Sequence, residues 1–481
     1  MTATTRVIFL AGFALAAYAC GSDTPTATST ASIEITDAAV NPTNSLSFVV
    51  GYKSTGADSV RIFVKNPAGV VDTTPAQAIT TDSRAIVLGL LPSTEYKLWG
   101  EVVSNGRVER SDTVAVSSGN IPTTLQEAKI AVSSGHLTGG FNLVNTNGAD
   151  GGYVTAFDSV GRLVWYRKVS DASLTATETK QQPNGDMTVY VGTSSGFNVA
   201  FGYYIEIAPD GSERRRFSAP APLYTDSHEL QMTFSADNAF QNALLFGYDR
   251  RRMTPTRPDG ADSILAAHHL ISVTPDGRAA EIFNGWDNFS LSDRIEPPDL
   301  PASSDIDHPN SLDIDSDGNY VVSWRNMGAI AKIDSRNGRI LWQLGGVKNQ
   351  FSILGDPLGG FSAQHSVRMT GPNKLLVFDN GTRHTPSESR AVEYQLDLVA
   401  KTATMIWQFR HSPPLYNQFQ GSAQRLKNGN TLIAYNAQGI VVEVAPDGTV
   451  IGEGKVEATA TTTIPFYRVT RIRSLYEWAA P

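Results

Sequence analysis

The sequence predicts an all-β protein in two parts, a small β-sandwich followed by a six-bladed β-propeller. Short runs of β-branched and aromatic residues alternate with turn residues along most of the chain, and the C-terminal part repeats one pattern of strands and turns. Hydrophobic residues make up 41% and charged residues 18% of the sequence, which is too apolar for a disordered chain. Because 47 acidic residues outnumber 39 basic ones, we expect no nucleic-acid partner.

Residues 1–20 are expected to form a lipoprotein-type signal peptide. An apolar run over residues 7–16 is shorter than the roughly 20 residues that span a bilayer. Ala17-Tyr18-Ala19 leads into Cys20, the one cysteine of the chain. This site resembles a bacterial lipobox, which implies that Cys20 is lipidated; export without a lipid and a buried structural Cys20 are the alternatives. With residues 21–31 as a flexible tether, we expect a lipid-anchored protein of the bacterial cell envelope, in the periplasm at the outer membrane or at the cell surface.

Residues 32–121 are expected to form the β-sandwich, because they contain several short strand-like runs separated by turn residues. The segment from Leu91 to Tyr96 looks like the tyrosine corner of a fibronectin type III domain, in which the Tyr hydroxyl bonds to nearby backbone. No set of reactive side chains converges in this domain. Such domains often serve as spacers or dimer contacts, so a homodimer is left open.

Residues 122–481 are expected to form the propeller, because one unit recurs along them. The unit contains a strand, an Asp-Gly or Asn-Gly turn, an apolar strand and a second Gly-containing turn before a Trp. The clearest copy covers residues 308–342. Further copies start near residues 179, 228, 365 and 422, and a degenerate copy at residues 157–165 has only its outer half. Six units of this kind fit propeller blades, although five or seven blades remain alternatives.

The run Asp313-Ile-Asp315-Ser-Asp317-Gly318 matches the start of a calcium-binding loop. An EF-hand loop needs Glu at its twelfth position, where this sequence has Trp324, and strand-like runs flank it in place of helices. Asp and Gly are also the residues of tight β-turns. We therefore interpret this run as a turn, and we expect neither a metal nor any other cofactor.

Three of the eight histidines, His228, His308 and His365, stand just before the first strand of their repeat. In a propeller these first strands surround the central axis and run the same way, so residues at this repeat position meet at one mouth of the channel. Asn310 lies two residues after His308 and therefore faces the same way on a strand. Arg325 ends the next strand of the same repeat.

This set of side chains suits the transfer of a small anionic group. A neutral imidazole is a nucleophile, a second imidazole can protonate a departing oxygen, and an arginine offers a planar fork of donors to oxyanions. The alternatives are packing histidines and a metal site built from histidines alone, because no carboxylate occupies the same repeat position.

Over residues 122–475 the sequence resembles the bacterial arylsulfotransferases, which are six-bladed propellers with a small N-terminal β-sandwich. The motifs that carry the resemblance are HPN at 308–310, SWRN at 323–326, ID at 333–334, GRILWQLGG at 338–346, QH at 364–365, FDNG at 378–381, GSAQRLKNGN at 421–430 and YR at 467–468. The resemblance implies transfer of a sulfuryl group from an aryl sulfate ester to a phenol, without a nucleotide sulfate donor.

The resemblance also implies a ping-pong mechanism through a sulfohistidine. By motif position, His365 is the expected nucleophile. His308 and Asn310 are expected to contact the sulfuryl group or the leaving oxygen, Arg325 to bind sulfuryl oxygens, and His228 to be the remaining acid or base.

Trp324 and Phe378 are expected to contact the phenol, since they are aromatic neighbours of these motifs. Two features differ from enterobacterial relatives, which are soluble in the periplasm and carry a disulfide near the site: this chain has a lipobox-like leader and a single cysteine. The alternative functions are hydrolysis of aryl sulfates, with water as the acceptor, and ligand binding by a propeller that catalyses nothing.

Overall fold

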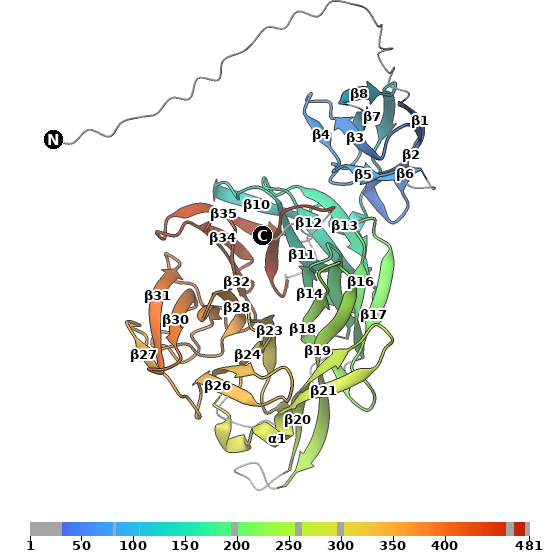
Figure 1. Cartoon of the computed structure of the whole chain (residues 1–481). Helices are drawn as coiled ribbons and strands as arrows, with labels where there is room; N and C mark the ends of the chain where they lie inside the picture. Colours follow the sequence, from blue (N-terminus) through green and yellow to red (C-terminus); the bar gives the residue numbers. More distant parts are fainter. Residues whose placement is uncertain are drawn as a thin grey trace, which may run out of the picture.

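The computed structural model describes residues 31–79, 83–104, 106–193, 201–254, 262–295, 303–457 and 466–476. The predicted signal peptide with Cys20, and all of the predicted tether except Ala31, lie outside these residues. The described chain forms a small β-sandwich and a large β-propeller (Figure 1). No helix among the described residues is long and apolar enough to cross a membrane.

The sandwich contains two antiparallel sheets, one of order β1-β2-β6 and one of order β4-β3-β7-β8, in which β5 pairs with β3 and β9 with β7. Its strands are β1 (Ser32–Asn41), β2 (Asn44–Thr55), β3 (Ser59–Lys65), β4 (Val71–Thr73), β5 (Gln77–Ala78), β6 (Arg84–Val87), β7 (Glu95–Ser104), β8 (Arg107–Arg110) and β9 (Val114–Ser117). The Tyr96 hydroxyl accepts the Leu91 amide at 2.9 Å, which is the contact expected of a tyrosine corner.

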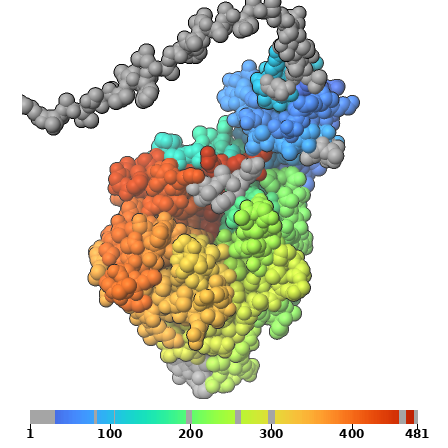
Figure 2. All heavy atoms as spheres, in the orientation of Figure 1, coloured from blue at the N-terminus to red at the C-terminus, as the bar shows by residue number. Residues whose placement is uncertain are grey.

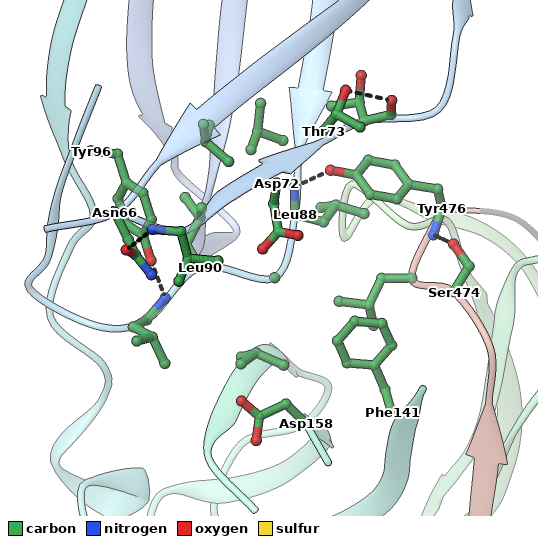
Figure 3. Close-up of a pocket in the computed structure, with 18 of the residues that line it drawn as sticks. Asn66, Asp72, Thr73, Leu88, Leu90, Tyr96, Phe141, Asp158, Ser474 and Tyr476 are labelled. Carbon is green, nitrogen blue, oxygen red and sulfur yellow. Dashed lines mark hydrogen bonds between the residues drawn. The ribbon is translucent and has the colours of Figure 1, made fainter. Parts of the chain in front are cut away.

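The sandwich is joined to the propeller by polar contacts. The Asn41 side chain donates to the Asp210 carbonyl at 2.8 Å, and the Ser45 and Tyr166 hydroxyls lie 2.9 Å apart. At the C-terminal end, the Leu88 amide donates to the Tyr476 hydroxyl at 2.8 Å (Figure 3). Figure 2 shows the sandwich against one side of the propeller, and a junction cavity of about 530 Å³ lies between the two domains.

The propeller has six sheets, as the repeats predicted, and we number them as blades in chain order. Blade 1 contains β11 (Phe141–Gly148), β12 (Gly151–Phe157), β13 (Leu163–Lys168) and β36 (Val469–Ile472); blade 2 contains β14 (Thr175–Gln181), β15 (Met187–Gly192), β16 (Gly202–Ile207) and β17 (Glu213–Phe217). Blade 3 contains β18 (Tyr224–Phe234), β19 (Phe240–Met253), β20 (Ser263–Val273) and β21 (Ala279–Asn284), with β22 (Ser303–Asp305) beside β20.

The other three blades follow the same pattern. Blade 4 contains β23 (Pro309–Ile314), β24 (Tyr320–Trp324), β25 (Ala329–Ile333) and β26 (Ile340–Gly345); blade 5 contains β28 (His365–Gly371), β29 (Lys374–Asp379), β30 (Arg390–Asp397), β31 (Thr402–Arg410) and β27 (Ser352–Leu354). Blade 6 contains β32 (Ser422–Arg425), β33 (Thr431–Tyr435), β34 (Ile440–Val444), β35 (Val450–Glu457) and β10 (Lys129–Gly135). Short helices are η1 (Thr123–Leu125), α1 (Gly285–Asn288) and η2 (Leu291–Asp293).

Both ends of the propeller sequence close the ring. β36, from the C-terminal end, pairs with β11 as the innermost strand of blade 1, and β10, from the N-terminal end, pairs with β35 as the outermost strand of blade 6. This explains why the first repeat at residues 157–165 has only an outer half, since its inner strand comes from the opposite end of the chain. The inner strands β14, β18, β23, β28, β32 and β36 pack against one another in turn around the channel.

The calcium-like run forms a turn, as predicted. The Gly318 amide donates to the Asp315 carbonyl at 2.8 Å, and Gly318 has a φ of +78°, a conformation that favours glycine. The Lys332 ammonium lies 2.5 Å from the Asp315 carboxylate and 2.7 Å from that of Asp317. A side-chain cation of the protein itself therefore pairs with both of these carboxylates.

Candidate active site

Ring closure brings the three predicted histidines to one end of the channel. The rings of His228 and His308 meet edge to face with centroids 4.7 Å apart, although the two residues lie in different blades. His365 is close enough for both imidazoles, and for the Arg325 guanidinium, to influence its pKa. The His228 and His308 side chains keep 18% and 20% of their surface exposed, whereas His365 keeps 2%, so solvent or a substrate reaches the first two most easily.

His228 and His308 each use Nδ1 to contact a buried carboxylate. His228 Nδ1 lies 2.8 Å from Asp226 Oδ1, and His308 Nδ1 lies 2.6 Å from Asp305 Oδ2. A carboxylate at Nδ1 fixes the orientation of an imidazole and stabilises its protonated form, leaving Nε2 to exchange protons with a ligand. Burial lowers the pKa of His308, and the Asp305 charge opposes this shift. Burial raises the pKa of the Asp305 carboxyl, but the His308 imidazole outweighs it and the pKa falls to about 2.

His365 has amide partners at Nδ1 in place of a carboxylate. Nδ1 lies 2.8 Å from Asn380 Oδ1 and 3.0 Å from the Ala363 carbonyl, both of which can only accept. The Gln420 backbone amide donates to Nε2 at 3.2 Å, so Nε2 carries a lone pair. Burial and then the Arg325 charge hold the pKa of His365 well below its ordinary value. His365 is therefore a neutral imidazole whose Nε2 has the electronic form of a nucleophile.

Local backbone geometry aims these side chains. His308 has a φ of +52° and is followed by Pro309, and Ser366, directly after His365, has a φ of +51°. Such conformations cost a non-glycine residue about 1–3 kcal/mol. They therefore persist only where the surrounding contacts hold the backbone in place. Around His308, its own amide donates to Asp307 Oδ1 and its carbonyl accepts the Arg325 amide, both at 2.9 Å. In both strands the register shifts close to the histidine, as in a β-bulge.

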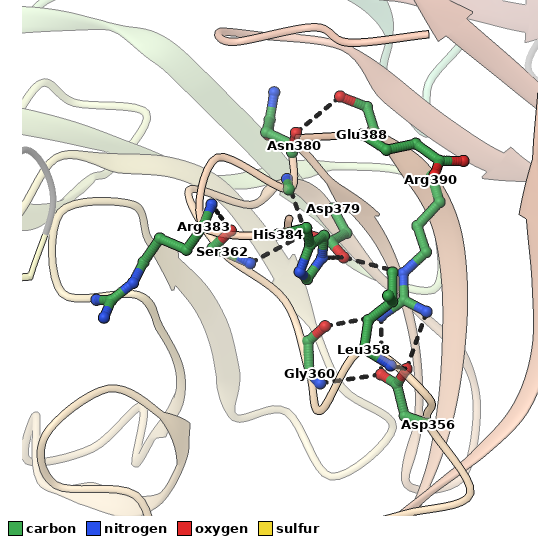
Figure 4. Close-up of polar contacts among 12 residues, drawn as sticks. Asp356, Leu358, Gly360, Ser362, Asp379, Asn380, Arg383, His384, Glu388 and Arg390 are labelled. Atoms are coloured by element: carbon green, nitrogen blue, oxygen red, sulfur yellow. Dashed lines mark hydrogen bonds and ion pairs between the residues drawn. The ribbon is translucent and has the colours of Figure 1, made fainter. Parts of the chain in front are cut away.

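A buried ion-pair network supports the loop that carries Asn380 (Figure 4). Arg390, fully buried, contacts Asp356 at 2.8 Å and Asp379 at 3.0 Å. The His384 Nε2 atom also lies 2.8 Å from Asp379. Asn380 follows Asp379 directly and donates through Nδ2 to the Asn417 and Gln420 carbonyls, so its Oδ1 is turned to His365.

Arg325 lies at the edge of this group of imidazoles and is 7% exposed. Its Nη1 donates to the Asn326 side chain at 3.0 Å, and its guanidinium lies 5.2 Å from the centroid of the Phe419 ring. Asn326 in turn donates to Asp305 Oδ1 at 2.8 Å, so Arg325 and His308 share one hydrogen-bond network. The Tyr467 ring lies 5.7 Å from that of His228. An aromatic ring therefore lies against Arg325 and another against His228.

His268 connects the two carboxylate-backed histidines. Its buried ring lies with Nδ1 2.7 Å from Asp307 Oδ1 and Nε2 3.4 Å from Asp226 Oδ2. Asp307 also accepts the His308 amide, and Asp226 contacts His228. Burial disfavours the charged imidazole, but Asp307 and Asp226 outweigh it and raise the pKa of His268 well above its ordinary value. A buried imidazolium therefore holds both Asp-containing loops in place.

The structure contradicts three predicted substrate contacts: the aromatic residues Trp324 and Phe378, and then Asn310. Trp324 is fully buried against Phe246, Phe283 and Phe289 in the core between blades 3 and 4. Phe378 is fully buried against Tyr435, in the core between blades 5 and 6. These rings are core residues because strand alternation turns them away from the channel.

Asn310 also differs from its expected role. It is fully buried, and its Nδ2 donates to the Gln364 carbonyl at 2.7 Å. It therefore ties β23 to the residue before His365 and makes no accessible contact for a sulfuryl group.

Sequence reasoning missed the partners of the imidazoles. Asp226 and Asp305 lie two and three residues before their histidines, so a carboxylate just upstream of each histidine was a readable signal. Asn380 belongs to the FDNG motif but had been given no role. His268 lies in the third strand of blade 3, and no local pattern indicates that it reaches the channel. In the described ranges, no group of three or more His, Cys, Asp or Glu side chains is placed to hold a metal ion.

The family comparison supports the resemblance seen in the motifs. Residues 298–457, whose described part runs from β22 to the end of β35, match the family model described as Arylsulfotransferase (ASST). This match supports the arylsulfotransferase resemblance over that segment of the chain. The segment contains His308, Arg325 and His365, whereas His228 and the closing strand β36 lie outside it.

Similarities to individual proteins are weak. No curated protein matches the chain. A protein of unknown function from Bacteroides caccae shares 14% identity with a TM-score of 0.41, covering 70% of this chain and 100% of its own. Virginiamycin B lyase from Staphylococcus aureus shares 11% identity with a TM-score of 0.34, covering 69% of this chain and 88% of its own. Similarities of this size carry no inference about function.

The substitution His268→Gln tests the bridging imidazolium. A raised pKa in the folded state means that protonation of His268 stabilises the fold fully below the unfolded pKa, near 6.5, and that this contribution is lost as pH rises toward the folded pKa. The difference in unfolding free energy between the natural protein and the variant should therefore shrink by about 1.4 kcal/mol per pH unit above pH ~6.5. Urea denaturation at a series of pH values measures it.

The substitution His136→Gln, at an exposed histidine, is the matched control. Its difference in unfolding free energy from the natural protein should not change with pH in this way. A His268→Gln difference that stays constant between pH ~6 and ~9 would mean that His268 is neutral in the fold.

Proposed function

We propose that this protein is an aryl-sulfate sulfotransferase that works by a ping-pong mechanism through a sulfohistidine at His365. The observation that carries the proposal is the contrast among the imidazoles. His365 has a neutral ring with a lone pair on Nε2, and beside it stand two imidazoles with carboxylate partners and one guanidinium. The match to the arylsulfotransferase family model over residues 298–457 supports the choice of reaction.

In the first half-reaction, the Gln420 amide releases His365 Nε2, and the freed lone pair attacks the sulfur of a bound aryl sulfate. The new N–S bond forms as the S–O bond to the aryl group breaks, and the phenolate oxygen takes the Nε2 proton of His308 or His228, whichever of the two is in its imidazolium form. Sulfuryl transfer resembles phosphoryl transfer, in which positioning and charge stabilisation supply most of the catalysis. Arg325 is proposed to bind the sulfuryl oxygens as charge builds on them.

In the second half-reaction, a phenol takes the place of the first product. Its hydroxyl proton passes to the imidazole that had donated one, its oxygen attacks the sulfur, and the N–S bond breaks to restore neutral His365. The ring of the donor or acceptor is proposed to lie against Phe419 and Tyr467, the aromatic side chains next to Arg325 and His228. Because Asn380 accepts the Nδ1 proton throughout, His365 presents the same nitrogen in both half-reactions.

The second candidate is an aryl-sulfate hydrolase, in which water takes the part of the phenol. The partial exposure of His228 and His308 favours it, since water reaches both rings. We further propose that the leader anchors the protein through Cys20 in the cell envelope, where small phenols and their sulfate esters are its partners.

Acceptor dependence separates transfer from hydrolysis. The purified full-length protein is incubated with a fluorogenic aryl sulfate, with and without a second phenol, and release of the fluorophore is followed. Because only an acceptor discharges the sulfohistidine efficiently, we expect steady release to need the added phenol, whose sulfate ester then accumulates. Equal release without the phenol would identify a hydrolase, and no release in either case would identify a binding propeller.

The nucleophile is tested by trapping the intermediate. Incubation with ³⁵S-labelled aryl sulfate alone should leave acid-labile label on the protein, and His365→Ala should abolish both the label and transfer. His308→Gln should still accept label but turn over about 10²–10⁴-fold more slowly, because it loses an acid and keeps the nucleophile. Normal labelling of His365→Ala would move the nucleophile to His228 or His308.

A further inference from the structure

The opposite mouth of the central channel contains a cavity with an unusual lining. Its volume is about 440 Å³, and it is formed by the inner strands β14, β18, β28, β32 and β36 with the residues that follow them. Each lining residue of β18 and β28 lies further along its strand than His228 or His365, so the cavity lies on the far side of the channel from the imidazoles. Seven of its lining residues are basic and none is acidic.

Five of the basic side chains pair with carboxylates that do not line the cavity. Glu229, fully buried, contacts Lys180, and also Arg368 and Arg468, each at 2.9 Å. Arg425 lies 2.9 Å from Glu393, and Arg471 lies 3.4 Å from Glu443. Five basic side chains therefore share three closely paired carboxylates, and Glu178, 3.7 Å from Arg468, is a fourth partner.

The other two basic residues, Lys427 and Arg473, are exposed at the rim and form no ion pair within the described residues. Two further donors in the lining also lack partners there: Arg468 Nε and Thr470 Oγ1 are buried with no hydrogen-bond acceptor.

A fourth carboxyl group, Glu178, lies fully buried in the channel. Burial raises its pKa to about 7, and it accepts no hydrogen bond among the described atoms. The nearest of its cations, Arg468, lies 3.7 Å away and also donates to the His228 carbonyl at 3.1 Å. Arg468 therefore stands between the two ends of the channel, and none of the three imidazoles lines the cavity.

We propose that this basic cavity is a second binding site, for a multiply charged oxyanion such as a sulfate or a phosphate group. Its size is that of a small-molecule site. Arginine forks bind tetrahedral oxyanions by paired charge-assisted hydrogen bonds. A monovalent carboxylate would leave most of the positive charge unmatched, so the site should prefer anions of higher charge.

The test is isothermal titration calorimetry of the full-length protein with inorganic pyrophosphate, and separately with inorganic sulfate and acetate, at low ionic strength. We expect binding in the order pyrophosphate, sulfate, acetate, and weaker binding as salt is added. The double variant Lys427→Ala/Arg473→Ala should weaken pyrophosphate binding at least ~10-fold, because it removes the two unpaired charges. Both side chains are exposed, so the variant should fold normally.

The matched control is Arg278→Ala/Lys455→Ala, which removes the same charge from exposed positions away from the cavity and should change the affinity less than ~2-fold. Arg325→Gln should also leave pyrophosphate binding intact, because Arg325 belongs to the imidazole end. No binding at ~10 mM pyrophosphate, or equal weakening in the control, would overturn the proposal. Loss of binding in Arg325→Gln alone would place the anion among the imidazoles.

Discussion

The closed ring of blades is the constraint on which the candidate active site depends. His228, His308 and His365 lie in three different blades, and they meet because the inner strands surround one axis in the same direction. The ring is completed by β36 on the inside of blade 1 and by β10 on the outside of blade 6. Residues next to β36 then become part of the channel, since Tyr467 contacts His228 and Arg468 contacts its carbonyl.

Three copies of one side chain acquire different chemistry from their hydrogen-bond partners. His228 and His308 each have a buried carboxylate at Nδ1, whereas burial and the charge of Arg325 keep His365 neutral and the amide oxygen of Asn380 accepts its Nδ1 proton. These partners are themselves fixed at a distance, by the His268 imidazolium on one side and by the Arg390 ion pairs on the other. In the proposed mechanism, the network behind the rings determines which imidazole attacks and which imidazoles transfer protons.

Much of this arrangement could be predicted from the sequence, because repeat position alone aligns His228, His308 and His365 on one channel mouth. The closing strand β36 could not be predicted from the sequence. Its four residues carry no repeat signature, and they pair with β11 across most of the length of the chain. Trp324 and Phe378 were assigned to the substrate because they are aromatic neighbours of the motifs, but strand alternation places them in the core. Asp226 and Asp305 could have been found from their positions two and three residues before a histidine, whereas no local pattern indicated His268.

The most direct measurement is ¹⁵N NMR of the protein with labelled histidine, assigned with single-histidine variants. The account predicts that the His365 signals show a proton on Nδ1 and a bare Nε2, and that this pattern persists as the pH is lowered to about 5, because burial and Arg325 hold its pKa well below its ordinary value. A His365 ring that is protonated at both nitrogens near neutral pH, or that carries its single proton on Nε2, would contradict it.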